Sequence, residues 1–175
     1  MSKLLAGFLV LFLSFTAMAE RPAARVSNKN AYLALGVSSV RLTESAASVS
    51  PFNIYGRLGY DFNRYIGIGF EGGGTLLEDE FQDIDFGITT LFGYLRLVAP
   101  IGAKSKIYAM VGPANVKLKA AALGGSISVD DDDTAYGIGF ERDLDGYGFT
   151  IDYISYYSNQ SVDVEGFSIG LIGYF

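Results

Sequence analysis

The sequence predicts an all-β protein, an eight-stranded antiparallel up-and-down transmembrane β-barrel with short periplasmic turns and longer extracellular loops. Three observations predict this fold. Apolar residues alternate with small or polar residues in eight segments, at the period of two that is typical of a strand. The segments come close to the ~9–11 residues that a tilted membrane strand requires. Tight connections alternate with longer ones, as expected when neighbouring strands run up and down.

The chain begins with a predicted signal peptide, residues 1–19. Lys3 supplies the positive start, residues 4–15 form an apolar core, and Ala17 to Ala19 make a small-x-small cleavage site. The alternative is an N-terminal membrane anchor, but the apolar run is shorter than the ~20 residues that a spanning helix needs. We therefore expect export with cleavage, which leaves residues 20–175 as a single barrel domain.

The eight expected strands follow one another with no helical stretch of comparable strength between them. They cover residues 30–41, 51–62, 65–75, 84–98, 105–116, 133–142, 147–157 and 164–175. The tight connections are residues 63–65, 99–104 and 143–146. The longer ones, rich in Ser, Asp, Glu and Gly, lie near residues 42–50, 76–83, 117–132 and 158–163.

The clearest alternation lies in residues 52–62, FNIYGRLGYDF. Ile54 and Leu58 share one face with several aromatic residues, whereas Arg57 and Asp61 share the other face with glycine. The later strands repeat this division between an apolar face and a face of small and charged residues. The charged residues of the second face are Arg57, Asp61, Glu71, Arg96, Glu141 and Asp152.

The character of this second face bears on whether the barrel lies in lipid or in water. A soluble barrel turns its apolar face inward, and its charged face is then a solvated exterior. A membrane barrel reverses the arrangement, and small and charged residues suit a narrow interior where ions pair. The export signal and the final strand ending at Phe175 favour the membrane. Tyrosines at strand ends suit the aromatic girdles of such a barrel, namely Tyr60, Tyr65, Tyr147, Tyr157 and Tyr174.

The C-terminal strand carries the most specific motif. Ser168, Gly170, Leu171 and Phe175 follow a pattern of a polar residue, a glycine and alternating apolar residues that ends in an aromatic. In this motif the chain resembles the eight-stranded outer-membrane barrels of Gram-negative bacteria, such as opacity-type proteins, small adhesion and invasion barrels and the barrel domain of outer membrane protein A. Residues 59–73 resemble the first periplasmic hairpin of these proteins. The resemblance implies location in the outer membrane and recognition of the last strand by the barrel-assembly machinery.

The first tight hairpin predicts a specific register. Pairing Phe62 with Ile66 leaves a three-residue loop, a common hairpin length, and keeps the two outward faces together. The same register places Arg57 opposite Glu71, so we expect an ion pair inside the barrel. Arg96 and Glu141 are expected to extend this network across the lumen, because an unpaired charge in a narrow interior is costly.

Composition excludes several chemistries. The chain has no Cys and no His, so it has no thiolate nucleophile, no histidine base and no His-ligated metal. The enzymes known on this barrel scaffold use an active-site histidine, and we therefore expect no enzymatic activity and no cofactor. The net charge of −6 argues against a nucleic-acid partner.

One acidic run is a weak candidate for a divalent cation: Asp130, Asp131, Asp132 and Asp133. Clustered carboxylates suit Ca²⁺, but a continuous run lacks the spaced D-x-D-x-D-G pattern of an EF-hand loop. A solvated acidic loop is the favoured interpretation, and a milder form of the hypothesis is cation bridging to lipopolysaccharide phosphates.

Two functions of different classes are compatible with this barrel. The first is a surface protein that supports the envelope or interacts with a host or surface ligand through its loops, with outer-membrane lipid and lipopolysaccharide as its surroundings. The second is a narrow pore for ions or small solutes, which side chains filling an eight-stranded interior disfavour. A soluble exported binder of lipocalin type is a third possibility.

Overall fold

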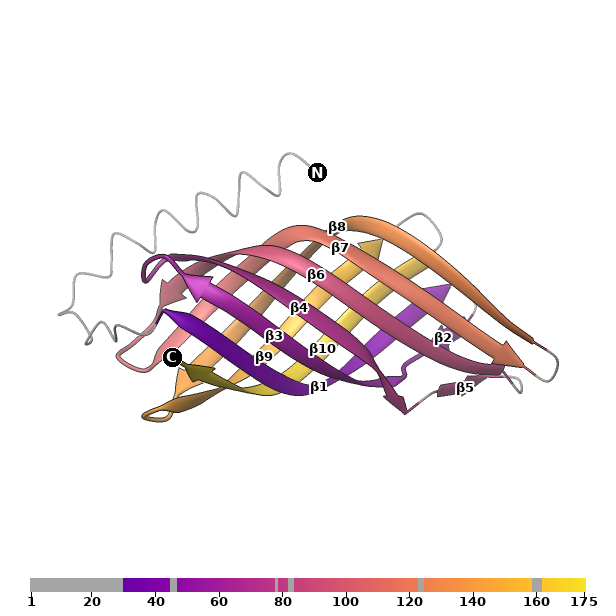
Figure 1. The fold of residues 1–175 in the computed structure, drawn as a ribbon, viewed down its shortest axis with the longest axis horizontal. Coiled ribbons are helices and arrows are strands. Elements are labelled where there is room, and N and C mark those ends of the chain that lie inside the picture. Colours follow the sequence, from indigo (N-terminus) through magenta and orange to yellow (C-terminus); the bar gives the residue numbers. More distant parts are fainter. Residues whose placement is uncertain (1–29, 45–46, 78, 82–83, 123–124, 159–161) are drawn as a thin grey trace.

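A computed structural model describes residues 30–44, 47–77, 79–81, 84–122, 125–158 and 162–175. The predicted signal peptide, residues 1–19, lies outside the described residues. Ten strands make up the structure (Figure 1): β1 (Ala31–Glu44), β2 (Ala47–Val49), β3 (Phe52–Asp61), β4 (Ile66–Leu77), β5 (Asp79–Phe81), β6 (Ile84–Pro100), β7 (Ser105–Ala122), β8 (Gly125–Asp143), β9 (Tyr147–Ser158) and β10 (Val162–Tyr174).

Eight of these strands form a closed antiparallel barrel. The order is β10-β9-β8-β7-β6-β4-β3-β1, and β1 pairs with β10 to close it. The two short strands lie outside this path, since β2 pairs with β1 and β5 pairs with β6 at one end. The described residues contain no helix long and apolar enough to cross a membrane. The predicted eight-stranded up-and-down barrel is confirmed.

The two ends of the barrel differ. Both described termini and the three tight turns lie at one end, which we call the turn end (Figure 1). Asn63 organises the first turn, since its Oδ1 accepts hydrogen bonds from the amides of Tyr65 (2.8 Å) and Ile66 (3.1 Å). In the last turn Asp145 and Gly146 have φ of 68° and 127°, the left-handed region that Asp and Gly tolerate best in hairpins.

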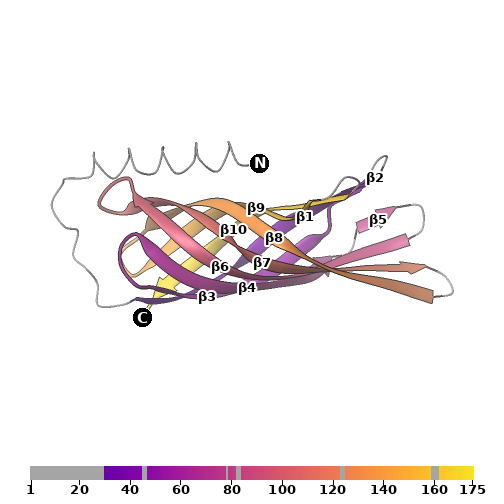
Figure 2. The same ribbon diagram turned by 90° about the horizontal axis from the view of Figure 1, so that it is seen from above.

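At the opposite end, the hairpin end, the structure corrects one expectation. Residues 117–132 were expected to be a loop, but β7 and β8 continue as a paired ribbon as far as Ala122 and Gly125. In Figure 2 this β7–β8 ribbon extends well beyond the body of the barrel. Ser, Asp and Gly have a low strand propensity, but here each residue of one strand pairs with a residue of the other, and this pairing outweighs the low propensity.

The wall alternates as predicted near the turn end, with apolar side chains outside and small or polar ones inside, whereas towards the hairpin end apolar side chains such as Phe92 and Ile88 also face inward. Leu35, Leu58 and Leu171 are exposed on the outer face, with fractions between 56% and 63%. Arg57 and Glu71, by contrast, are at most 3% exposed and point into the lumen. The barrel thus has an apolar exterior and a buried charged interior.

Lumen tyrosines pack over glycines of the neighbouring strands, which the sequence analysis did not anticipate. Tyr32 faces Gly59 across β1 and β3, and a Cβ on Gly59 would lie closer than 3.0 Å to its ring. The same arrangement recurs around the barrel in the pairs Tyr94–Gly69, Tyr108–Gly139, Tyr55–Gly36 and Tyr156–Gly166. Glycine therefore creates the space for a large interior ring at these five positions.

Candidate functional site

The charged interior is organised around Arg57, which lies on β3. Its Nη2 and Nε contact Glu71 Oε2 on β4 at 2.5 and 2.9 Å, and its Nη1 contacts Asp152 Oδ2 on β9 at 3.1 Å. One guanidinium thus joins an adjacent strand to the opposite wall of the lumen. Tyr156 donates a hydrogen bond to Glu71 Oε1 at 2.6 Å, and Tyr108 donates one to Asp152.

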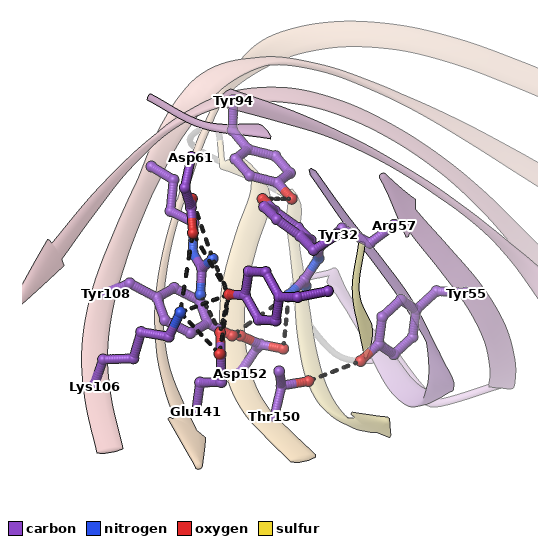
Figure 3. A network of polar contacts seen from close by, with 12 residues as sticks. Tyr32, Tyr55, Arg57, Asp61, Tyr94, Lys106, Tyr108, Glu141, Thr150 and Asp152 are labelled. Carbon is purple, nitrogen blue, oxygen red and sulfur yellow. Dashed lines mark hydrogen bonds and ion pairs between the residues drawn. The ribbon is translucent and has the colours of Figure 1, made fainter. Parts of the chain in front are cut away.

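A second group of charges lies nearer the turn end and is centred on Arg96 of β6. Its Nη2 lies 2.5 Å from Glu141 Oε2, and its Nη1 lies 3.5 Å from Asp61 Oδ1. Lys106 contacts Glu141 Oε1 at 2.9 Å and donates a hydrogen bond to the Tyr174 hydroxyl at 2.6 Å. The Tyr174 hydroxyl in turn donates to Glu141 at 3.0 Å. Figure 3 shows this group beside the one that contains Asp152.

Aromatic rings connect the two groups. The Arg96 guanidinium carbon lies 4.1 Å from the centroid of the Tyr108 ring, whose hydroxyl reaches Asp152. Tyr32 and Tyr94 bond to each other at 3.0 Å through their hydroxyls (Figure 3). The rings of Tyr32 and Tyr108 are at most 1% exposed, so the lumen at this level is filled by side chains.

Towards the hairpin end the interior becomes apolar. Phe92, Ile88, Val116 and Ile154 are at most 3% exposed and belong to one packed cluster. The described lumen therefore consists of a polar layer near the turn end and a mainly apolar layer above it. Most of these side chains are buried, whereas Lys106 and Asp61 at the turn end stay 25% and 15% exposed.

The structure brings together all four residues of the predicted ion network, Arg57, Glu71, Arg96 and Glu141. The pairing of Arg57 with Glu71 follows from the β3–β4 register, which places Asp61 opposite Gly67 as predicted. The sequence analysis placed Asp152 on the same face but did not include it in the network. Its position on the opposite wall depends on closure of the barrel, which no local spacing specifies.

One aromatic expectation is wrong. Tyr174 was expected in an interfacial girdle, but its hydroxyl lies inside the lumen against Lys106 and Glu141. Alternation along β10 gives the reason: Tyr174 lies an even number of residues after Ser168 and Gly170, so it shares their inward face, where both are buried. Tyr60 and Tyr147 are 44% and 59% exposed near the turn end, a location compatible with a girdle.

The residues of the predicted assembly signal alternate across the wall of β10. Ser168 is 4% exposed and donates a hydrogen bond to Asp152 Oδ2 at 3.3 Å. Gly170 is buried, whereas Leu171 and Phe175 are 63% and 64% exposed on the outer face. Recognition of this strand by the assembly machinery stays a prediction.

The four aspartates of the candidate cation site do not lie in a loop. They belong to β8, where consecutive side chains point to opposite faces. Asp130 and Asp132 share the outer face and accept hydrogen bonds from the Asn115 amide at 2.5 and 3.0 Å. Among the described residues no group of three or more potential ligands converges on one point. A cation at these four aspartates stays a weak prediction.

A family model described as an outer membrane protein β-barrel domain matches residues 8–175. The chain belongs to this family. It is therefore an outer-membrane barrel protein of Gram-negative bacteria, as the C-terminal motif and first hairpin predicted. None of the curated proteins compared with the chain matches it.

Solved outer-membrane barrels have the same fold. Ail, the attachment invasion locus protein of Yersinia pestis, is 20% identical with a TM-score of 0.67, over 85% of this chain and 99% of Ail. Neisserial surface protein A is 12% identical with a TM-score of 0.69, over 83% and 97% of the two chains. OprG of Pseudomonas aeruginosa is 12% identical with a TM-score of 0.57, over 84% and 96%. These likenesses show the fold.

Proposed function

We propose that this outer-membrane barrel is a non-enzymatic surface protein that interacts with its partner through the β7–β8 ribbon. The observation that carries the proposal is an unpaired strand edge. β8 pairs with β9 only from Tyr136 to Asp143, so that among the described residues Gly125–Ala135 have β7 on one side and no strand on the other. In the orientation expected for the family, this edge faces out of the cell.

An unpaired edge presents backbone donors and acceptors that an extended segment of another protein can satisfy. The ribbon also exposes apolar side chains, since Ile127 and Val129 are 73% and 54% exposed. Four consecutive aspartates disfavour pairing of this edge with a second copy of itself. The charge therefore favours a partner segment rich in Lys or Arg.

The relatives suggest a comparable role with different chemistry. Ail is an attachment invasion protein, and one Ail structure contains the heparin analogue sucrose octasulfate. In this chain the edge strand carries the four aspartates Asp130–Asp133, and their negative charge suits a basic segment better than a sulfated ligand. We therefore propose surface attachment for this chain as well, but to a basic protein segment.

The alternative function, a narrow pore, has less support. The central lumen residues Arg57, Arg96 and Tyr108 are between 0% and 3% exposed, which argues against a continuous water path. The absence of His and Cys and the complete pairing of Glu71 and Asp152 support a barrel without enzymatic activity.

Attachment of living cells tests this function. Cells that produce the wild-type chain are compared with deletion cells on epithelial and matrix surfaces. A third strain carries a ribbon shortened by replacing residues 119–128 with Asn-Gly, a favoured two-residue turn. We expect the shortened ribbon to lower attachment, because it removes residues 125–128 at the tip of the free edge, including the exposed side chain of Ile127.

Two further variants separate the edge from its charge. Replacing all four aspartates Asp130–Asp133 with Asn keeps the strand and is expected to weaken attachment, whereas Asp163→Asn, an exposed position of β10, is expected to leave it unchanged. Heat-modifiable migration in gels verifies that each barrel is folded. Equal attachment by the wild-type, deletion and shortened-ribbon strains would contradict the proposed function and favour a purely structural role.

A further inference from the structure

The barrel wall has an irregularity between β6 and β7. Pairing of the two strands runs to Phe92 opposite Ala114 and resumes at Leu95 opposite Val111. Gly93 lies in the interruption on β6 and Pro113 on β7. Proline has no amide hydrogen for the ladder, and a Cβ on Gly93 would meet no atom within 4 Å. The outer wall therefore lacks both a regular pairing and a side chain at this point.

A hollow of about 250 Å³ occupies this position on the outer wall. Phe70 and Leu91 flank it, with 53% and 44% of their surfaces exposed, and Gly93 and Pro113 complete its apolar lining. Asn115 and Asp132 lie on the side towards the hairpin end. The hollow is continuous with the apolar exterior of the barrel, which in an outer-membrane protein contacts lipid.

The residues of β7 place the hollow at the upper edge of this apolar exterior. The outward side chains of β7 change from Ile107 and Val111 to Asn115 and then to Lys117 and Lys119. The apolar wall thus ends just beyond Pro113 on β7, because the next outward side chain is Asn115. In a membrane barrel such a boundary lies at the level of the lipid head groups. In the family orientation this level belongs to the outer leaflet.

Lys117 and Lys119 are exposed on the same outer face as the hollow. Neither forms an ion pair with another described residue, although Asp130 lies opposite Lys117 in the ladder. Asp130 and Asp132 also lie on this face, where they accept hydrogen bonds from Asn115 and form no ion pair with either lysine. Lys117 and Lys119 are thus the two cations of β7 that lie between the hollow and the hairpin end, where an anionic head group would sit.

We propose that the hollow binds an acyl chain of a lipopolysaccharide molecule of the outer leaflet, whose phosphate groups contact Lys117 and Lys119. The apolar lining suits a hydrocarbon chain. Along β7 the outward surface changes from apolar at Pro113 to cationic at Lys117, as a lipid changes from its acyl chains to its phosphate groups. This inference rests on the location of the barrel in the outer membrane and does not depend on the partner of the β7–β8 ribbon.

Native mass spectrometry of the full chain, extracted from outer membranes in mild detergent, tests the proposal. The probe is the lipopolysaccharide of the producing strain, and phosphatidylethanolamine is counted in the same spectra. Gly93→Phe is designed to fill the hollow without a clash, and Gly93→Leu is a smaller second variant. We expect each to retain about tenfold less lipopolysaccharide than the wild type, because the chain loses its apolar contacts.

The double variant Lys117→Gln with Lys119→Gln removes the head-group contact and is expected to lower retention similarly. Two matched controls are expected to retain lipopolysaccharide as the wild type does. Gly74→Phe fills another outward glycine with no atom within 4 Å, and Arg142→Gln removes an exposed cation at the turn end. Heat-modifiable migration verifies folding of every variant.

Three results would overturn the proposal. Wild-type retention by both Gly93 variants would show that the hollow holds no chain. An equal loss in Gly74→Phe would show that any outward bulk disturbs the lipid shell. Phosphatidylethanolamine in place of lipopolysaccharide, with no effect of the lysine variants, would assign the hollow to an ordinary phospholipid.

Discussion

Arg57→Met is expected to destabilise the folded barrel by about 3–5 kcal/mol, since removal of one partner leaves charges buried without compensation. Arg57 contacts Glu71 at 2.5 Å and Asp152 at 3.1 Å, and all three side chains are almost inaccessible. Methionine replaces the aliphatic part of the arginine side chain and leaves both carboxylates without their cation. The free energy of unfolding is measured by urea titration in detergent micelles, with circular dichroism and heat-modifiable migration as the two readouts.

Two controls accompany this variant. Arg142→Met removes an exposed arginine near the turn end and is expected to change the stability by less than about 0.5 kcal/mol. The triple variant Arg57→Met, Glu71→Gln and Asp152→Asn removes all three charges and is expected to recover part of the loss. A loss below about 1 kcal/mol for Arg57→Met alone would mean that the pair behaves as an exposed ion pair.

Gly59→Ala is the second substitution with a large expected effect. A Cβ at this position would lie closer than 3.0 Å to the ring of Tyr32. The ring has little room to move, because it is 1% exposed and its hydroxyl bonds to Tyr94. We expect a loss of about 1–3 kcal/mol, the usual cost of overpacking, in the same unfolding measurement.

The comparison with other glycines isolates the cause. Gly74→Ala meets no atom within 4 Å and is expected to stay within about 0.5 kcal/mol of the wild type. In the background Tyr32→Leu the cost of Gly59→Ala is expected to fall, because the ring that it meets is absent. Equal losses for Gly59→Ala and Gly74→Ala would indicate a general cost of alanine in these strands instead.

Local alternation was sufficient to predict most of the barrel. The period of two in residues 52–62 identified the inner and outer faces, and the short loop after Phe62 determined the register that pairs Arg57 with Glu71. Once the faces are known, the lumen charges follow. The strand count followed from the eight alternating segments, and the family followed from the motif of the last strand and the first hairpin.

The features that the sequence did not predict depend on partners far along the chain. Asp152 reaches Arg57 only because the barrel closes, and Tyr108 meets Gly139 only in the β7–β8 register. The length of the β7–β8 ribbon was missed for a different reason. Its composition is typical of a loop, and its strand structure comes from pairing that a single segment does not reveal.

The barrel has an interior that forms a stabilising core, and both of our proposals place its interactions on the outside. The polar layer around Arg57 and Arg96 and the apolar layer around Phe92 leave the described lumen filled. The β7–β8 ribbon and the outer wall near Gly93 are the surfaces that we propose for a protein partner and for lipid. The two proposals concern different faces and are tested separately.

Single-channel recording of the purified wild-type chain in planar bilayers tests the central claim most directly, namely that the lumen is closed. Because side chains fill the interior, we expect no steady conductance above roughly a few tens of picosiemens in concentrated salt. A steady current well above that level, absent from protein-free bilayers, would contradict a closed lumen and would show that the barrel is a pore.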